Sequence, residues 1–160
     1  MEISVYSRQY AQEVIDLILN IQQNEFGVPV TIADQPDLLN VENFYCKDKG
    51  NFWIATENKI LIGSIALIDI GNRQSALRKM FVHKDYRGKE IKAGQQLLDF
   101  VIDWCKEKGI DEIYLGTFDK LVAAQRFYLK NGFVEIKKQS LPANFPVMPV
   151  DNMFFKLRIA

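Results

Sequence analysis

The chain has 160 residues, of which 48% are hydrophobic and 25% are charged, with 20 basic and 20 acidic side chains. This composition is typical of a globular protein and excludes disordered and collagen-like chains, and a net charge of zero argues against a nucleic-acid-binding surface. A chain of this length buries roughly 70% of its unfolded surface, so residues 1–160 are expected to form one domain without metals or disulfides.

The first part of the chain predicts a short strand followed by two helices. Residues 3–6 alternate in polarity as a strand does, and apolar residues then recur at helical spacing over 14–21. Gly27 ends this first helix, and a second helix is expected over 36–45.

From residue 52 onward the hydrophobic period becomes that of strands. Three strands joined by tight turns are expected over 52–56, 60–70 and 76–82. After them the chain predicts, in order, a helix that begins near Gly94 and ends at Gly109, a strand over 113–117, a helix from Leu121 that ends before Gly132, and strands over 133–137 and 153–159. The order β-α-α-β-β-β-α-β-α-β-β indicates the α/β class, with a mixed central sheet of about seven strands, antiparallel hairpins and about four helices.

Cysteine usage and the apolar runs indicate a protein of the cytoplasm. Only Cys46 and Cys105 are present, which is too few for a disulfide scaffold. The start Met1-Glu2-Ile3 has no basic region of a signal peptide, and no apolar run reaches the ~20 residues that a membrane helix needs. We therefore expect a cytoplasmic protein with no membrane partner.

The charges are unevenly distributed along the chain. Residues 1–46 contain seven acids and the single base Arg8, so the remaining residues carry 13 acids and 19 bases. Such a division suits a small anionic ligand bound beside a cationic one. A solvated surface without functional meaning explains it equally well at this point.

The segment most informative about chemistry joins the strand that ends at Val82 to the helix that begins near Gly94. Residues 86–95 read YRGKEIKAGQ. Glycines and bases before a helix N-terminus offer backbone N–H groups and positive charge to an anion. The segment contains neither G-x-x-x-x-G-K-[ST] nor G-x-G-x-x-G, which excludes the nucleotide triphosphate loop and the dinucleotide fingerprint.

Two segments carry a resemblance to a known family. Residues 82–89, VHKDYRGK, followed by a Leu-Leu helix, resemble motif A of the GCN5-related N-acetyltransferases (GNAT), commonly V-x-P-x-Y-R-G-x-G-x-G/A. Residues 124–133, AQRFYLKNGF, resemble the family's motif B, A-x-x-[FL]-Y-x-K-x-G-F. The motifs stand in the family's order and spacing, and the expected elements fit the GNAT fold over nearly the whole chain. The subgroup that it resembles is that of small bacterial acetyltransferases of unassigned substrate.

The resemblance implies that acetyl-CoA binds as a co-substrate and that no metal is used. The loop from Arg87 to Gly94 would hold the pyrophosphate, and the pantetheine would lie along 80–82, where two strands splay apart. The implied cofactor-binding residues are Met80, Phe81, Val82, Arg87, Gly88, Lys89, Glu90, Ile91, Lys92, Ala93, Gly94, Gln95, Ala124, Phe127 and Tyr128. Glu90 and Lys92 stand where the motif usually has glycines, and Gly94 stands in for the last glycine of a longer loop.

The resemblance also implies catalytic roles. Tyr128 would be the general acid toward the thioester sulfur, because a phenol of pKa ~10 stays protonated at neutral pH. A backbone N–H near Phe81 would meet the oxyanion. The general base stays open, since the Glu that many relatives carry on the strand before the loop is Arg78 here. The alternatives, acting directly or through water, are Asp69, Glu57 and Asp151.

By analogy with the family, two segments roof the acceptor side. One is the first helical region, which belongs to the acidic part of the chain, and the other is the segment 141–149, which holds three of the five prolines and is extended. We therefore predict a cationic amine acceptor with an apolar portion. The expected acceptor-binding residues are Glu25, Asp34, Asp69, Phe145 and Met148.

Together these features predict an enzyme, an N-acetyltransferase that moves an acetyl group from acetyl-CoA to a primary amine by direct attack. Its partners would be acetyl-CoA and a small amine or peptide amine, and a homodimer is compatible with this interpretation. The alternative is a non-catalytic coenzyme A-binding sensor or interaction module with the same fold. Arg78 favours the sensor and Tyr128 the enzyme. His83 is expected at the surface and Cys105 in the core.

Overall fold

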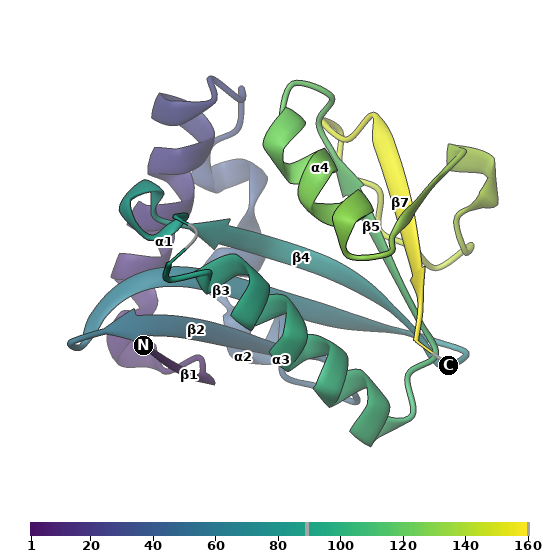
Figure 1. Cartoon of the computed structure of the whole chain (residues 1–160), viewed down its shortest axis with the longest axis horizontal. Helices are drawn as coiled ribbons and strands as arrows, with labels where there is room; N and C mark the ends of the chain where they lie inside the picture. Colours follow the sequence, from purple (N-terminus) through teal and green to yellow (C-terminus); the bar gives the residue numbers. More distant parts are fainter. Residues whose placement is uncertain (89, 160) are drawn as a thin grey trace.

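The computed structural model describes residues 1–88 and 90–159. They form a seven-stranded sheet in the order β1-β2-β3-β4-β5-β7-β6, in which all neighbours are antiparallel except β4 and β5 (Figure 1). The strands are β1 Glu2–Val5, β2 Asn51–Glu57, β3 Ile60–Gly71, β4 Gln74–Val82, β5 Glu112–Thr117, β6 Val134–Ile136 and β7 Met153–Arg158. The α-helices are α1 Ala11–Leu19, α2 Val41–Tyr45, α3 Ala93–Lys108 and α4 Val122–Lys130. The predicted order of elements is confirmed.

Helices cover both faces of the sheet, with α3 and α4 on one face and α1 and α2 on the other (Figure 1). Strand β2 shows how the sequence achieves this. Trp53 and Ala55 pack into the apolar cluster that includes α3, whereas Phe52 and Ile54 pack into the cluster of α1 and α2. A strand that is covered on both faces carries a continuous apolar run, as β2 does. Within the described residues, no helix is long and apolar enough to cross a membrane.

Residues with positive φ close the turns that the sequence predicts. Asn58 and Lys59 have φ of 51° and 66°, and Asn72 and Arg73 have φ of 55° and 59°. Two successive residues with positive φ match the right-handed twist of the flanking strands, so each pair closes a tight hairpin. Gly109, with a φ of 75°, ends α3 in the left-handed conformation that glycine adopts without strain.

The first helical region differs from the prediction in two places. Helix α1 continues as a π-helical turn over Asn20–Glu25. The single helix predicted over 36–45 is wrong, because a 3-10 turn over Pro36–Leu39 is followed by a break at Asn40, with φ of −149° and ψ of 52°. Asn40 takes the N-cap position of α2, where its backbone carbonyl accepts from the Phe44 N–H at 3.0 Å, so a second helix starts there instead of an extension of the first.

Candidate active site

Strands β4 and β5 pair near one end and then separate. Their parallel pairing runs from Gln74 and Glu112 to Ala76 and Tyr114, after which β4 continues to Val82 along β3. Figure 1 shows the two strands diverging from this point. The expected splaying is therefore present, and it leaves backbone donors and acceptors along one edge of β4 available to a ligand.

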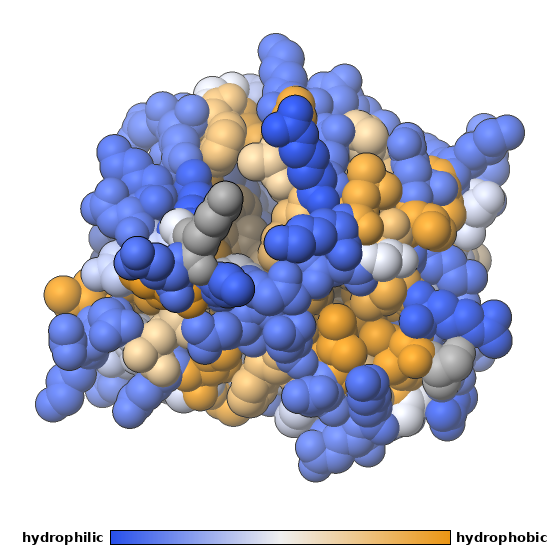
Figure 2. Space-filling model, viewed as in Figure 1, coloured by the Kyte–Doolittle hydropathy of each residue, from blue (hydrophilic) through white to orange (hydrophobic). Residues whose placement is uncertain are grey.

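A groove of about 640 Å³ lies where the end of β4, the following loop and the starts of α3 and α4 meet. Figure 2 shows a hollow between hydrophilic residues on the face from which Figure 1 is drawn. The residues of the predicted cofactor set that line the groove are Met80, Phe81, Val82, Arg87, Gly88, Lys92, Gly94, Gln95, Ala124, Phe127 and Tyr128. The groove is also lined by residues that the sequence did not single out, namely Ile21, Phe26, Leu121, Ala123 and Lys130.

Three further residues of the predicted cofactor set, Glu90, Ile91 and Ala93, do not line the groove. Ile91 and Ala93 pack against the apolar cluster beneath α3, and Ala93 is completely buried. Glu90 is exposed. Lys89 lies outside the described residues, so its predicted role stays a prediction.

The start of α3 provides a site for an anion on the groove. Lys92 precedes the helix in the left-handed conformation, with φ of 52° and ψ of 40°, and its side chain does not cap the helix. The first turn contains no acidic residue. The first N–H groups of a helix have no acceptor within the helix and carry partial positive charge, so they attract an anion. A Cβ at Gly94 would lie 3.7 Å from Met80 Cε, so glycine there keeps this part of the groove wide.

Arg87 stands at the groove in contact with the opposite wall. Its Nε donates to the Val82 carbonyl at 2.7 Å, and its Nη atoms donate to both carboxylate oxygens of Glu25. Its guanidinium also lies 5.8 Å from the centre of the Phe26 ring. Glu25, which was predicted to bind the acceptor, therefore pairs with a residue predicted to bind phosphate.

A second space, a cavity of about 330 Å³, continues from the groove between β4 and β5. The groove and the cavity share the lining residues Phe26, Met80, Phe81, Leu121, Ala124 and Tyr128. Of the residues predicted to bind the acceptor, Asp34 and Met148 line this cavity. Asp34 also accepts from the backbone N–H and hydroxyl of Thr31, as part of a capping box. Ligands in the groove and in the cavity would therefore meet beside Tyr128.

Phe145 and Asp69, also predicted to bind the acceptor, lie elsewhere. Phe145 is buried in a separate apolar cluster, where its ring lies 6.4 Å from that of Phe154. Asp69 accepts from the backbone N–H groups of Lys49 and Gly71 at 3.1 and 2.8 Å, near the hairpin that ends β3. Neither side chain lines the groove or the cavity.

Tyr128 lies at the junction of the two spaces. Its ring packs against Phe133 and Phe155 at centroid distances of 5.5 and 5.9 Å, which fixes the direction of the phenol. Burial, together with the nearby carboxylate of Asp151, raises the pKa of Tyr128 to about 12. The phenol is therefore protonated throughout the neutral range and can donate its proton or a hydrogen bond.

Of the three candidate bases, the structure brings Asp151 to the cavity. Burial raises its pKa, while Arg78, a hydrogen bond from the Met148 backbone and Lys79 oppose the rise. Gly116 makes room for it, because a Cβ at this position would lie 2.5 Å from Asp151 Oδ2. A larger residue at position 116 would therefore force the Asp151 side chain to shift.

The other two candidate bases have structural partners. Glu57 forms an ion pair of 3.0 Å with the terminal amino group of Met1, and Asp69 accepts from the backbone of the hairpin described above.

The predicted positions of the single histidine and of Cys105 can be compared with the structure. His83 accepts a hydrogen bond of 3.2 Å from the Asp85 backbone N–H, and its side chain is 39% exposed. Cys105 is completely buried, and burial raises the pKa of its thiol to about 12. The predictions of a surface histidine and a core cysteine are confirmed.

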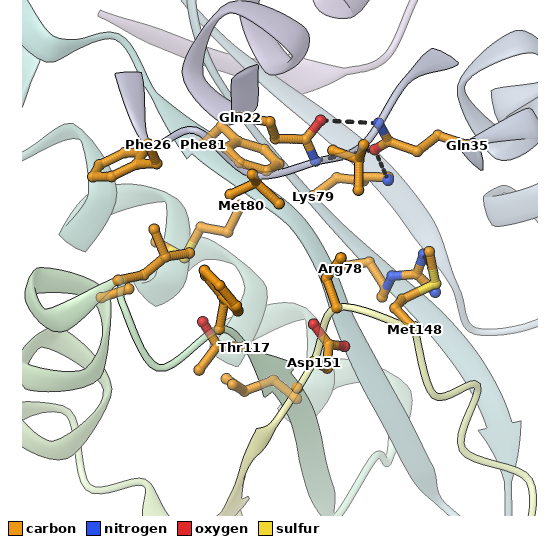
Figure 3. Close-up of a pocket in the computed structure, with 18 of the residues that line it drawn as sticks. Gln22, Phe26, Gln35, Arg78, Lys79, Met80, Phe81, Thr117, Met148 and Asp151 are labelled. Carbon is orange, nitrogen blue, oxygen red and sulfur yellow. Dashed lines mark hydrogen bonds between the residues drawn. The ribbon is translucent and has the colours of Figure 1, made fainter. Parts of the chain in front are cut away.

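A buried polar network that the sequence did not reveal forms one wall of the cavity. Lys79 has a φ of 52° at an irregularity in the pairing of β3 with β4, and its Nζ donates to Gln35 Oε1 at 2.5 Å. Its Nζ also lies 3.6 Å from Asp37 Oδ2, which accepts from the Tyr45 hydroxyl at 2.5 Å. Gln22 bonds to Gln35 in turn (Figure 3). Burial lowers the pKa of Lys79 to about 8, and Asp37 opposes this.

Comparisons with known proteins agree on one class. A model of the acetyltransferase (GNAT) family matches residues 15–133. A GNAT family acetyltransferase of known structure from Staphylococcus aureus Mu50 is 49% identical, with 99% of both chains covered and a TM-score of 0.96. Streptothricin acetyltransferase A of Bacillus subtilis strain 168 is 30% identical over 125 residues, which cover 78% of this chain and 70% of the relative.

More distant relatives share the fold over different lengths. The PaiA N-acetyltransferase of Thermoplasma acidophilum, solved in complex with coenzyme A, is 20% identical with a TM-score of 0.79, and 98% of both chains is covered. The chain spans about half the length, 45% to 49%, of several animal N-acetyltransferase relatives that it matches.

Proposed function

The chain belongs to the acetyltransferase (GNAT) family, and from this premise we propose that it moves the acetyl group of acetyl-CoA to a primary amine by direct attack. The observation that carries the proposal is the junction at Tyr128 of a groove suited to a nucleotide thioester and a cavity suited to an amine. The name of the Bacillus subtilis relative supports the same class of reaction.

The groove suits acetyl-CoA in its charge and in its open strand edge. The N-terminus of α3, with Arg87 and Lys92 beside it, would hold the pyrophosphate. The edge of β4 at 80–82 that no strand covers would pair with the amide groups of the pantetheine arm, beside the Val82 carbonyl that accepts from Arg87. Acetyl-CoA supplies the thioester whose carbonyl carbon the amine attacks.

The residues at the junction match the proton movements of this reaction. The amine enters as an ammonium ion, and Asp151 accepts its proton directly or through water. A C–N bond then forms while the C–S bond breaks, with a backbone N–H near Phe81 as donor to the oxyanion. Tyr128 gives its proton to the departing sulfur. The ammonium ion loses two protons in all. The first goes through Asp151 to solvent, and the second, which leaves the nitrogen as the amide forms, balances the proton that Tyr128 gives to the sulfur, so that each turnover releases one proton.

Two measurements test the proposal. Calorimetry should detect binding of acetyl-CoA, and thiol release from acetyl-CoA should rise when amines from a mixed panel are added. Binding without thiol release for any amine would instead favour a coenzyme A-binding sensor. Absence of any binding heat at millimolar coenzyme A would refute the cofactor assignment.

A further inference from the structure

The two positively charged side chains that line the cavity differ in whether a carboxylate of the protein pairs with them. Arg78 and Lys79 are neighbours on β4 and both line the cavity. The ammonium of Lys79 donates to Gln35 and lies beside the carboxylate of Asp37, which balances its charge. Figure 3 shows Lys79 pointing toward Gln35, away from Asp151. The positive charge of Lys79 is thus paired within the protein and is not available to a ligand.

The guanidinium of Arg78 is in the opposite situation. Its one hydrogen bond among the described residues is from Nη2 to the thioether sulfur of Met148, at 3.2 Å. Sulfur is a weak acceptor, and a guanidinium carries five N–H donors in a planar fork that matches a carboxylate. No carboxylate of the described residues lies within 4.0 Å of Arg78. This side chain is half-buried with its donors largely unused.

Arg78 lies close to the residues that are proposed to carry out the acetyl transfer, so its charge acts on a molecule bound in the cavity. Figure 3 shows Arg78 and Met148 on the same side of the cavity as Asp151. The charges of Arg78 and Asp151 act on one another, since Arg78 opposes the effect of burial on the Asp151 carboxyl. A molecule in a cavity of about 330 Å³ that places an amine at Asp151 and Tyr128 also comes under the influence of the Arg78 charge. A second positive charge of the acceptor close to this guanidinium would be repelled.

We propose that the acceptor is a small amine that also carries a carboxylate, as amino acids do, and that Arg78 binds this carboxylate as the specificity-determining residue. The inference rests on the proposed acetyl transfer. It changes the expectation of a purely cationic acceptor, such as a polyamine or an aminoglycoside, to that of a zwitterion. The apolar surface of Met148 beside the guanidinium would receive the apolar part of such a molecule.

Matched acceptors test this with the unaltered protein. Common amino acids, their amides and the corresponding decarboxylated amines are compared by thiol release from acetyl-CoA, and their binding to the coenzyme A complex is compared by calorimetry. We expect at least one amino acid to exceed its amide and its decarboxylated amine by on the order of 10-fold in kcat/KM and in affinity. Acids that never exceed their amides in either measurement would overturn the inference.

Variants assign the preference to Arg78. In Arg78→Gln the ratio of acid to amide should fall by on the order of 10- to 100-fold, and the intrinsic reactivities of the amines cancel in this comparison. Arg78→Lys should keep part of the ratio, because it keeps the charge without the fork. Lys106→Gln removes an exposed charge in the last turn of α3 and should leave the ratio unchanged. An unchanged ratio in Arg78→Gln, with coenzyme A binding intact as evidence of folding, would overturn the assignment.

The outcome also separates this inference from the proposed function. Lack of acetyl-CoA binding would overturn both. Turnover in which amides or decarboxylated amines are used as well as the acids would leave acetyl transfer standing and overturn the zwitterionic acceptor alone. If Arg78→Gln fails to fold, the comparison of matched acceptors on the unaltered protein still decides the question.

Discussion

The ion pair between Glu25 and Arg87 predicts that a substitution can tighten coenzyme A binding. Glu25 takes one N–H of each Nη of Arg87 and neutralises the guanidinium charge, so it competes with a pyrophosphate for this side chain. Glu25→Gln removes this competitor and also a negative charge beside the groove. We therefore expect Glu25→Gln to bind coenzyme A more tightly than the unaltered protein.

The structure sets the size of the effect. The side chains of Arg87 and Glu25 remain 36% and 25% exposed, which places the pair among surface ion pairs instead of buried ones. Such pairs contribute about 0.2–1 kcal/mol, and the two-pronged geometry argues for the upper end. About 1 kcal/mol corresponds to a dissociation constant roughly 5-fold lower. Arg87→Gln, by contrast, loses a charged contact of about 1.5–3 kcal/mol and should weaken binding by roughly 10-fold or more.

Titration calorimetry of the two single variants and the double variant with coenzyme A measures the coupling. The gain from Glu25→Gln should shrink in the Arg87→Gln background, because no pair remains to be opened, and it should also shrink at high salt. Glu42→Gln is the matched control, since it breaks the exposed pair with Arg8, outside the groove and the cavity. Weaker binding by Glu25→Gln, or an equal gain in both backgrounds, would refute competition for Arg87.

Three further predictions concern the junction of the groove and the cavity. Tyr128→Phe should lower kcat by about 100-fold or more with little change in coenzyme A affinity, and normal turnover would refute its role as acid. Because burial raises the pKa of Asp151, kcat/KM should rise with pH through a value above the usual range of an aspartate, and Asp151→Asn should remove this rise from the pH profile. Gly116→Ala should displace Asp151 and lower kcat/KM, together with a loss of about 1–3 kcal/mol in the free energy of unfolding by urea.

Local patterns sufficed for the order of elements but not for the second helix. The two-residue turn at Asn58 and Lys59 needs positive φ, which asparagine tolerates, and Gly109 ends α3 in the left-handed conformation that glycine adopts without strain. The helix predicted over 36–45 failed because its apolar spacing continues across Asn40, whereas the backbone does not. A break of this kind depends on packing of both segments against the sheet, which spacing alone does not report.

In the candidate site too, the features that depend on local sequence could be predicted and those that depend on distant segments could not. The motif resemblance located the groove, since its residues lie close together in the sequence. The partners of those residues come from distant segments, as in the pair of Arg87 with Glu25, which lie 62 positions apart. The role of Lys79 could not be found either, because its direction depends on an irregularity in the pairing of β3 with β4. The adjacent bases at 78 and 79 inside an apolar strand were the one available signal.

The short pairing of β4 with β5 has a mechanical consequence. Within the sheet, three residue pairs of β4 and β5 join the block of β1 to β4 to the block of β5 to β7, whose side chains otherwise meet in the apolar cluster beneath α3. A thioester seated in the opening would contact strand β4 on one side and helix α4 on the other, and so add cohesion that the polypeptide lacks there. At a ligand concentration 100 times the dissociation constant this adds about 2.7 kcal/mol to the resistance to unfolding. The substrate would then also hold the two blocks together. Its binding would raise the melting temperature and lower the deuterium uptake of both blocks.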